Sequence, residues 1–306
     1  MSQEHPVPTD RARELVRGGV DYHIHISPDF VERRITDVQL ARRCHEVGLA
    51  GFGLKSHYSS TAERAQVVAE AVPDTIVLGA ITLNASVGGL NALAVEIAAR
   101  EGATLVWFPT VSSVNESHEV LEADPNGKVP VWVRFELSLR EAGLNPPTVA
   151  VVDDSGALVP EAVEVLRTIA RHDLVLNTGH LSRAEIATLV DGAVEHGVQR
   201  IVVTHPEFPS QRISPADQVE LARRGALMER AFTTPYTGKC SWEAVFEATR
   251  AVGAQSTVWC TDLGQVFHPP VEDGLAIMAD MHLEAGFSED EIRTMAVENT
   301  RRIAGA

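Results

Sequence analysis

The chain has 306 residues, of which 44% are hydrophobic and only 5% aromatic, a composition that suits one large α/β barrel better than an all-β sandwich. It has 26 basic and 42 acidic residues, and the resulting formal charge of −16 argues against partners such as nucleic acid or an anionic membrane. Three cysteines are too few for a disulfide framework. The N-terminus lacks a signal-peptide pattern and no apolar run approaches the roughly 18 residues of a membrane span, so we expect a cytoplasmic protein.

Strand and helix patterns alternate along almost the whole chain. Eight apolar stretches typical of buried strands are each followed by a helical pattern. They begin near residues 19, 51, 75, 104, 173, 200, 226 and 256. Eight such units predict a (β/α)8 TIM barrel that forms a single domain over residues 1–306. An open doubly wound sheet is the alternative, but no G-x-G-x-x-G or Walker A run follows the first strand.

Capping residues mark several of the expected helix starts. Asp10 is the expected cap of a short first helix. Ser-x-x-Glu capping boxes are expected before three later helices. They are Ser60–Glu63, Ser182–Glu185 and Ser288–Glu291.

Residues 113–160 interrupt the alternation, and we interpret them as an insertion after strand four. The stretch "VPVWVRFELSL" (129–139) is predicted to be extended. The stretch "VAVVDDSGALV" (149–159) is predicted to be a hairpin with Asp-Ser-Gly in its turn. The insertion is a candidate lid or oligomer contact, and we expect a homo-oligomer.

Ionisable residues collect where the predicted strands end. In "DYHIHIS", Asp21, His23 and His25 are two residues apart, so they are expected to share one face of the first strand. The others are Lys55 and His57 (strand two), His180 (strand five), His205 (strand six), Glu229 (strand seven) and Asp262 (strand eight). Each of these residues alone is compatible with a structural role. Together they place five of the 12 histidines at the barrel end where active sites lie, and imidazole and carboxylate are metal ligands, so a metal site is predicted.

This constellation resembles the amidohydrolase superfamily of metal-dependent hydrolases, from "DYHIH" to the terminal "ENTRRIAG". The resemblance implies that His23 and His25 bind the more buried metal. It implies that His180 and His205 hold the more exposed metal of binuclear members. It implies further that Asp262 binds metal or the nucleophilic water and transfers its proton. The expected cofactor is one or two divalent ions, zinc first, with manganese or iron as alternatives.

Strand four departs from the common pattern of that superfamily. Many binuclear members carry a carboxylated lysine or a glutamate there as a bridge, whereas this strand ends "VWFPTV". Lys55 is the nearest replacement for this bridging residue, and we expect it to contact the metal region in the form of a carbamate. Glu136, in the insertion, is a weaker candidate. The departure leaves the number of ions open between one and two.

The resemblance implies hydrolysis of a small molecule by a metal-activated hydroxide, at a C–N amide or cyclic amide bond or at a lactone or ester. Asp262 is the expected general acid and base, and a protonated His57 or His205 is expected to stabilise the oxyanion. Candidate substrate-binding residues follow or lie on the strands. They are Glu229, Arg34, Arg212, Tyr236 and Lys239.

Two rival functions remain open from the sequence. One is a mononuclear decarboxylase or hydratase on the same barrel, which needs one metal and tolerates the loss of Lys55. The other is a barrel without catalysis that serves as a metal-binding regulatory protein. A histidinol-phosphatase-like phosphoesterase also opens with His-x-His, but its further ligands are spaced differently.

Overall fold

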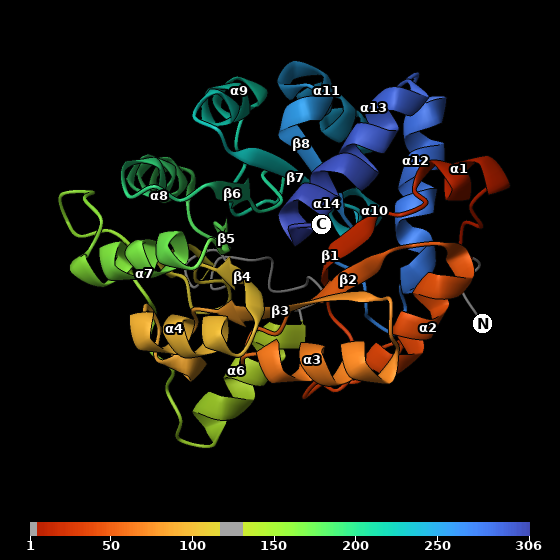
Figure 1. Ribbon diagram of the computed structural model, residues 1–306. Coiled ribbons are helices and arrows are strands. Elements are labelled where there is room, and N and C mark those ends of the chain that lie inside the picture. Colours follow the sequence, from red (N-terminus) through yellow and green to blue (C-terminus); the bar gives the residue numbers. More distant parts are fainter. Residues whose placement is uncertain (1–4, 117–130) are drawn as a thin grey trace.

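Eight parallel strands surround a common axis in the computed structural model, which describes residues 5–116 and 131–306 (Figure 1). Each strand is hydrogen-bonded to the next in chain order. The strands are β1 (Val20–Ile24), β2 (Gly51–Leu54), β3 (Ile76–Thr82), β4 (Ala103–Trp107), β5 (Val175–Asn177), β6 (Arg200–Val203), β7 (Leu227–Ala231) and β8 (Thr257–Cys260). Backbone bonds of 2.8 Å, from Asp262 N to His23 O and from His25 N to Leu263 O, join the chain after β8 to β1. The predicted (β/α)8 barrel is confirmed.

Helices cover the outside of the barrel because each turns one apolar face toward the strands. In α7, for example, Ala162, Val165, Leu166 and Ile169 are buried at spacings of one, three and four residues. The longer helices are α2 (Asp37–Val47), α3 (Ala62–Ala71), α4 (Ala92–Arg100), α6 (Val131–Glu141), α7 (Pro160–Arg171), α8 (Arg183–Glu195), α9 (Pro215–Arg223), α11 (Trp242–Val252) and α12 (Gly274–Glu284). Short segments are α1 (Asp10–Leu15), α10 (Thr233–Tyr236), α13 (Glu289–Arg293), α14 (Asn299–Ala304) and four turns, η1 (Ala85–Val87), η2 (Ala254–Ser256), η3 (Val271–Asp273) and η4 (Thr294–Glu298). None of the helices within the described ranges has the length and apolar character that a membrane span requires.

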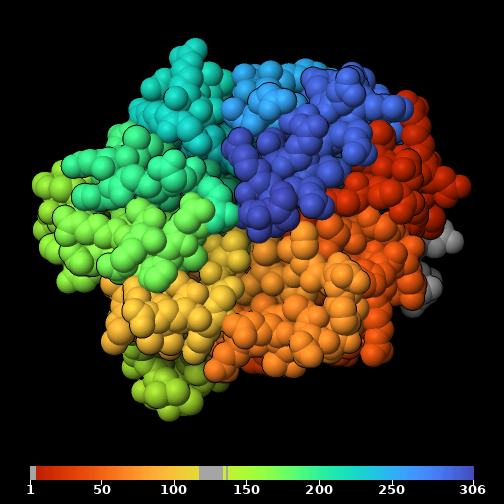
Figure 2. Space-filling view, in the orientation of Figure 1, coloured from red at the N-terminus to blue at the C-terminus, as the bar shows by residue number. Residues whose placement is uncertain are grey.

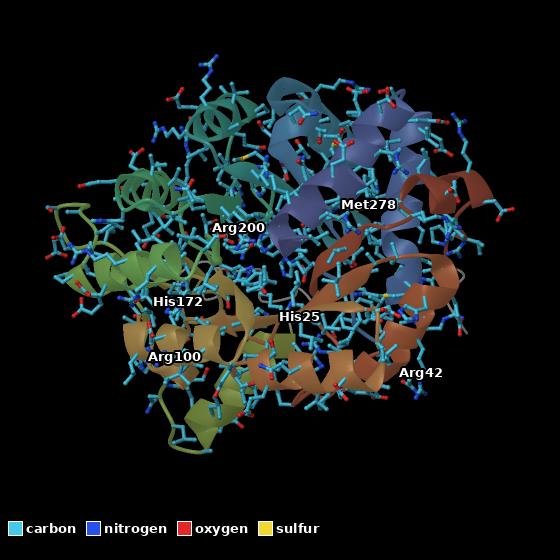
Figure 3. The ribbon with its side chains drawn as sticks, viewed as in Figure 1. His25, Arg42, Arg100, His172, Arg200 and Met278 are labelled. Atoms are coloured by element: carbon cyan, nitrogen blue, oxygen red, sulfur yellow. The ribbon has the colours of Figure 1, made fainter. Side chains whose placement is uncertain are left out.

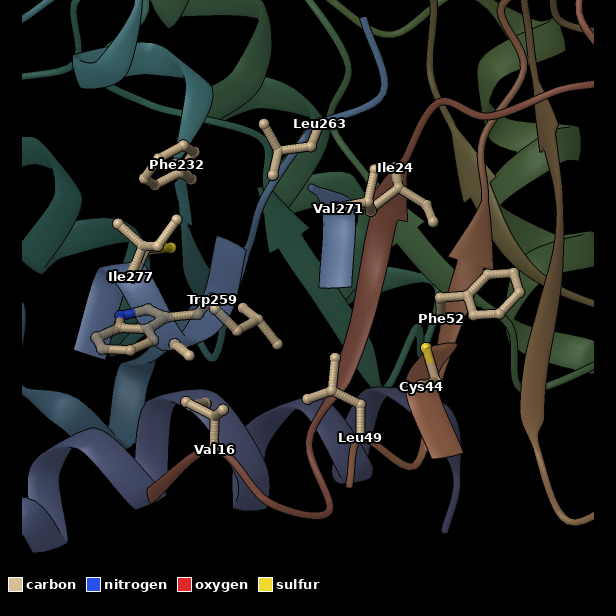
Figure 4. Close-up of a cluster of buried hydrophobic side chains, with 14 of the residues drawn as sticks. Val16, Ile24, Cys44, Leu49, Phe52, Phe232, Trp259, Leu263, Val271 and Ile277 are labelled. Atoms are coloured by element: carbon tan, nitrogen blue, oxygen red, sulfur yellow. The ribbon is translucent and has the colours of Figure 1, made fainter. Parts of the chain in front are cut away.

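The outer faces of β1, β2 and β8 pack against the helices in one apolar layer (Figure 4). Ile24 of β1, Phe52 of β2 and Trp259 of β8 meet Cys44 of α2 and Ile277 of α12, and all five side chains are buried. Complete burial of such a side chain stabilises the fold by about 1.5–3 kcal/mol. This layer holds the first, second and eighth strands in the positions from which the candidate site is built.

The C-terminal segment closes the end of the barrel at which the strands begin. Asn299 donates to the backbone oxygens of Thr257 (2.7 Å) and Ala254 (3.0 Å), and Val20 N donates to the Thr300 hydroxyl (3.1 Å). Figure 1 views the molecule from this end, and in Figure 2 the blue C-terminal segment fills the space between the red N-terminal and the green central segments. The candidate site therefore lies at the other end, where the strands finish.

The insertion between β4 and α7 differs in part from the prediction. The extended conformation predicted for 129–139 is wrong for its described part, because α6 starts at Val131. Phe135 and Leu139 are four residues apart and lie on one half-buried side of this helix, so a helical period overrides the β-branched composition. The predicted hairpin is confirmed by an antiparallel bridge between Val152 and Leu158. Residues 117–130 lie outside the described part of the chain.

Two of the expected helix caps are wrong. Thr9, not Asp10, caps α1, and its hydroxyl accepts a backbone N–H of the first turn. The box at Ser60–Glu63 is absent because Thr61 occupies the N-cap position and its hydroxyl donates to the Leu54 carbonyl (2.6 Å). The boxes at Ser182–Glu185 and Ser288–Glu291 are confirmed.

A buried histidine in α12 lies among aromatic rings on the outside of β8. The ring centroid of His282 is 4.3 Å from that of Trp259, 4.9 Å from that of Phe246 and 5.0 Å from that of Phe287. Its Nδ1 donates to the Met278 carbonyl (2.8 Å). Burial lowers the pKa of His282 to about 3, so the folded protein holds this imidazole neutral.

We predict that His282 weakens the fold on acidification. The unfolded chain protonates this imidazole below pH 6.5 and the folded chain does not, so the free energy of unfolding falls as the pH drops from about 6.5 toward 3, by up to about 1.4 kcal/mol per pH unit. Urea denaturation at a series of pH values measures this slope, and His282→Leu is expected to reduce it. The control His196→Leu, at the end of α8, should leave the slope unchanged, and equal slopes for parent and His282→Leu would contradict the prediction.

Candidate metal site at the end of the strands

The predicted site residues converge around the barrel axis at the end opposite to α14. His25 lies near the centre of the barrel, whereas Arg42, Arg100 and His172 lie on the surrounding helices (Figure 3). His23 and Glu229 are fully buried, and His25, Lys55 and His205 are nearly so. The convergence follows from the parallel sheet, because the ends of all its strands meet at one rim.

A bulge in β1 decides which residues of "DYHIHIS" enter the barrel. Between Asp21 and Ile24 the register against β2 shifts, so three steps along β1 match two along β2. Tyr22 and His23 consequently both reach Glu229 in the interior, while Asp21 accepts bonds from the backbone N (2.9 Å) and hydroxyl (2.5 Å) of Thr261. The expectation that Asp21 shares a face with the two histidines is wrong.

Three predicted metal ligands bring their donor atoms together. Oδ1 of Asp262 lies 3.4 Å from Nε2 of His23 and 3.2 Å from Nε2 of His25. The three atoms all lie within 4.8 Å of one another. Ligand atoms bound to a tetrahedral zinc ion at about 2.0–2.2 Å lie about 3.3–3.6 Å apart. The spacing and the chemistry of this donor set therefore fit a divalent metal ion.

Glu229 occupies the floor of the site and orients His23. Its Oε2 accepts bonds from the Tyr22 hydroxyl (2.6 Å) and from Nδ1 of His23 (3.1 Å), and its Oε1 accepts from the backbone N of His205 (3.0 Å). Burial opposes ionisation of Glu229, but His23, His205 and Tyr22 outweigh burial and lower its pKa to about 2. The carboxylate thus fixes the His23 ring with Nε2 turned toward Asp262, an arrangement typical of metal-binding histidines.

Lys55 and Trp107 complete the floor beside His23. Nζ of Lys55 lies 2.9 Å from Nε2 of His23 and 5.2 Å from the ring centroid of Trp107. Burial lowers the pKa of Lys55 below its usual range. Trp107 is the last residue of β4, so an indole occupies the position at which many binuclear members of the amidohydrolase superfamily carry a bridging lysine or glutamate. The structure places Lys55 in the predicted region, and its role as a ligand or carbamate stays a prediction.

The remaining histidines line the other side of the site. The ring of His57 stacks on that of His25 (4.8 Å between centroids) and lies 6.1 Å from that of His180, which is 4.9 Å from that of His205. Thr110 holds His57 through a 2.8 Å bond between its hydroxyl and Nδ1. Within the described residues, Nδ1 of His180 and of His205 are buried without a hydrogen-bond partner. His180 and His205 thus each present a ring nitrogen that makes no hydrogen bond within the described residues, whereas Nδ1 of His57 is bonded to Thr110.

Burial keeps four histidines of the site, His25, His57, His180 and His205, neutral. It lowers the pKa of His25 to about 3 and of His205 to about 4, and it brings those of His57 and His180 well below their usual range. Asp262 has the opposite balance: burial opposes ionisation, but His23 and His25 lower its pKa well below the usual range. Neutral imidazole and ionised carboxylate are the forms that bind metal ions.

Two site residues have backbone conformations that L-amino acids rarely adopt. The φ angles of His205 and Asp262 are 24° and 51°. Gly264 makes the turn after Asp262 possible, because a Cβ there would lie 1.5 Å from the His25 carbonyl oxygen. Such strain persists only where surrounding bonds enforce it, and it is concentrated at functional sites.

The candidate substrate-binding residues are placed at different distances from the site. Glu229 is fully buried and its carboxylate is engaged within the protein. Nζ of Lys239 lies 5.4 Å from the ring of Phe208, which stacks on the ring of His180 and lies 4.9 Å from that of His205.

The other three candidates lie further out. Arg34 is exposed and donates to the Val266 carbonyl (3.1 Å), and Arg212 is also exposed. Tyr236 is half-buried and its hydroxyl bonds to the ring of His5 (3.0 Å). Substrate binding by any of the five candidates stays a prediction.

One buried residue of the site was missed by sequence reasoning. Glu116 lies at the start of the insertion, and its Oε2 is 3.7 Å from Nδ1 of His180. Ser113 and Asn115, in the same segment, donate to the His180 carbonyl (3.0 and 3.2 Å). No periodic pattern marks this segment, so the sequence offered no signal for it.

Comparison with known proteins places the chain in a family. Residues 18–229 match the model of a family of unknown function, DUF6282. The chain belongs to this family. No curated protein matches the sequence.

Solved structures of amidohydrolases share the fold of this DUF6282 member. An amidohydrolase from Pseudomonas aeruginosa is 12% identical, with a TM-score of 0.61 over 96% of this chain and 98% of the other. The probable dipeptidase PvdM from the same species is 10% identical, with a TM-score of 0.60 over 97% of each chain. An organophosphorus hydrolase from Deinococcus radiodurans is 15% identical, with a TM-score of 0.51 over 99% and 100%. The predicted likeness to the amidohydrolase barrel is confirmed for the fold.

We predict that Glu229→Gln weakens metal binding by about 10-fold to 100-fold, because an amide cannot accept all three bonds that the carboxylate accepts. Competition with a chelator measures the affinity for zinc. Glu96→Gln is the matched control, because Glu96 also accepts a bond from a histidine (His172, 2.8 Å) but lies on α4. Unchanged zinc affinity in Glu229→Gln would show that the carboxylate does not orient a ligand.

Proposed function

We propose that the protein is a divalent-metal-dependent hydrolase that cleaves a C–N amide or cyclic amide bond of a small molecule, or a lactone or ester. The observation that carries this proposal is the trio of donor atoms from His23, His25 and Asp262, spaced as ligands of a tetrahedral ion. The structural neighbours include an amidohydrolase and a probable dipeptidase, which supports amide chemistry.

We propose one ion per chain, with zinc as the metal. The donor atoms of His23, His25 and Asp262 form a group of metal-binding size, whereas β4 ends in Trp107 and supplies no bridging carboxylate. Nζ of Lys55 lies next to the ligand atom of His23, where it can donate to a bound substrate or water. His180 and His205 then serve the substrate rather than a second ion.

The residues around Asp262 suit it to proton transfer. Its side chain is 24% exposed, and the Thr233 hydroxyl donates to Oδ2 (3.0 Å) and fixes the carboxylate. A divalent ion held by His23, His25 and Asp262 would supply a bound water with a pKa lowered toward about 7 and a charge that polarises a carbonyl oxygen. Asp262, ionised at neutral pH, accepts the proton of the attacking water and returns it to the leaving amine.

The imidazoles opposite Asp262 are suited to stabilising the oxyanion. Because burial keeps His57 and His205 neutral, they act as neutral N–H donors, not as the imidazolium ions expected from the sequence. Thr110 holds Nδ1 of His57, so its other ring nitrogen is the one available to a substrate.

A lyase that uses the same metal is the second candidate. One ion, with Asp262 acting in turn as base and acid, also suits decarboxylation or hydration. The two reactions leave different products. Turnover in ¹⁸O-labelled water puts one labelled oxygen into the acid product of a hydrolase, whereas a decarboxylase releases carbon dioxide.

We predict one equivalent of zinc per chain, measured by elemental analysis of protein purified without a chelator or affinity tag. His23→Ala combined with His25→Ala should abolish this zinc, because both ligand atoms are lost. His196→Ala, a histidine at the end of α8, is the control and should keep the metal. Two equivalents in the parent would refute the single-ion site, and zinc retained by the double variant would refute the ligand assignment.

Asp262→Asn is expected to lower kcat by about 100-fold to 10,000-fold at saturating zinc, because the amide cannot accept the proton of water. The measurement uses the substrate that the parent turns over fastest in a panel of dipeptides, N-acyl amino acids, cyclic amides and lactones. Asp280→Asn is the matched control, since Asp280 accepts bonds from Thr9 at the surface. An Asp262→Asn variant as active as the parent would remove Asp262 from the mechanism.

A further inference from the structure

Aromatic rings continue outward from the histidines to the surface along one wall of the site. The ring of His57 stacks on that of His25, and Tyr58 follows His57 in the chain. The ring of Phe30, in the loop after β1, meets that of Tyr58 edge-on at 4.7 Å between centroids. Phe135 of α6 lies 4.1 Å from Phe30 and 5.1 Å from Tyr58. We call Phe30, Tyr58 and Phe135 the aromatic wall.

The aromatic wall leaves apolar surface open beside the site. Phe30 is 44% exposed, and Tyr58 and Phe135 are half-buried. Its three rings come from three separate segments, the loops after β1 and β2 and the insertion. A cluster of partly exposed rings next to buried polar groups is typical of a ligand-binding surface.

The opposite side of the site also carries a ring. Phe208, after β6, stacks on His180 (6.1 Å between centroids) and lies 4.9 Å from His205. The rings of His57 and His180 connect the two sides at 6.1 Å. Aromatic rings therefore lie on both sides of the histidines of the site.

We propose that the aromatic wall binds an aromatic group of the substrate, on the side of His57, and that Phe135 makes the insertion a determinant of specificity. This inference rests on the proposed function, because the metal site places the bond that reacts. A planar ring gains both apolar burial and favourable ring–ring geometry against Phe30, Tyr58 and Phe135. A small aliphatic group in the same position gains neither.

Two hydroxamates test the wall without requiring turnover, because the hydroxamate group binds a divalent metal whatever substituent it carries. The dissociation constants of benzohydroxamate and acetohydroxamate are measured by calorimetry on the zinc-loaded protein. We expect the parent to bind benzohydroxamate at least about tenfold more tightly. Phe135→Ala should reduce this preference by about threefold to tenfold, as expected for the loss of one aromatic pair.

Phe30→Ala provides a second, independent variant, since Phe30 lies in a surface loop and is 44% exposed, so its removal should leave the fold intact. Leu137→Ala is the control, because Leu137 is also an apolar residue of α6 but is exposed. It should keep the parent's preference.

The outcomes separate the wall from the metal site. Equal affinities for the two hydroxamates in the parent, or an unchanged preference in both Phe135→Ala and Phe30→Ala, would overturn the wall and leave the metal site standing. If neither hydroxamate binds the parent in the presence of zinc, the metal site fails and the wall loses its premise with it.

Discussion

The candidate site depends on a single carboxylate inside the barrel. Glu229 of β7 accepts bonds from Tyr22, His23 and the backbone of His205, so it joins strands that are distant in the chain. A buried carboxylate without such donors would cost several kcal/mol, and each of the three bonds to it contributes about 1.5–3 kcal/mol. Because both carboxylate oxygens of Glu229 accept hydrogen bonds, the His23 ring is held in one orientation. Its Nε2 then faces Asp262, which follows β8.

The barrel was predictable from the sequence because each of its strands is short, apolar and followed by an amphipathic helix. The same regularity predicts that His23, His25, His180, His205 and Asp262 lie at one rim of the barrel. Irregular features were not predictable. The bulge that brings His23 to the same side of the strand as Tyr22 breaks the period of two, and the helical conformation of α6 contradicts its β-branched composition. Glu116 reaches His180 only through the fold of an aperiodic segment.

The backbone strain at His205 and Asp262 is offset by hydrogen bonds of their own amides to other residues of the site. Left-handed backbone at His205 and Asp262 costs on the order of 1–3 kcal/mol per residue. The amide of Asp262 donates to His23 O, and the amide of His205 donates to Glu229, so each strained residue is held by a member of the site. These two bonds therefore stabilise the backbone conformation that directs the side chains of His205 and Asp262 toward the barrel axis. A molecule or ion bound between these side chains would meet an arrangement that is already formed.

The insertion contacts both His180 in the candidate site and the aromatic wall beside it. Its first residues bind the segments that follow β5 and β6: Ser113 and Asn115 both donate to the His180 carbonyl, and Asn115 also donates to the Ser210 carbonyl (2.9 Å). Its later part supplies Phe135 to the aromatic rings above His57. Because one segment contacts both His180 and the aromatic wall, we propose that a change in its length or sequence alters the site and the substrate choice together. Barrels of this type diversify through the loops that follow their strands, and we propose that the loop after β4 has that role here.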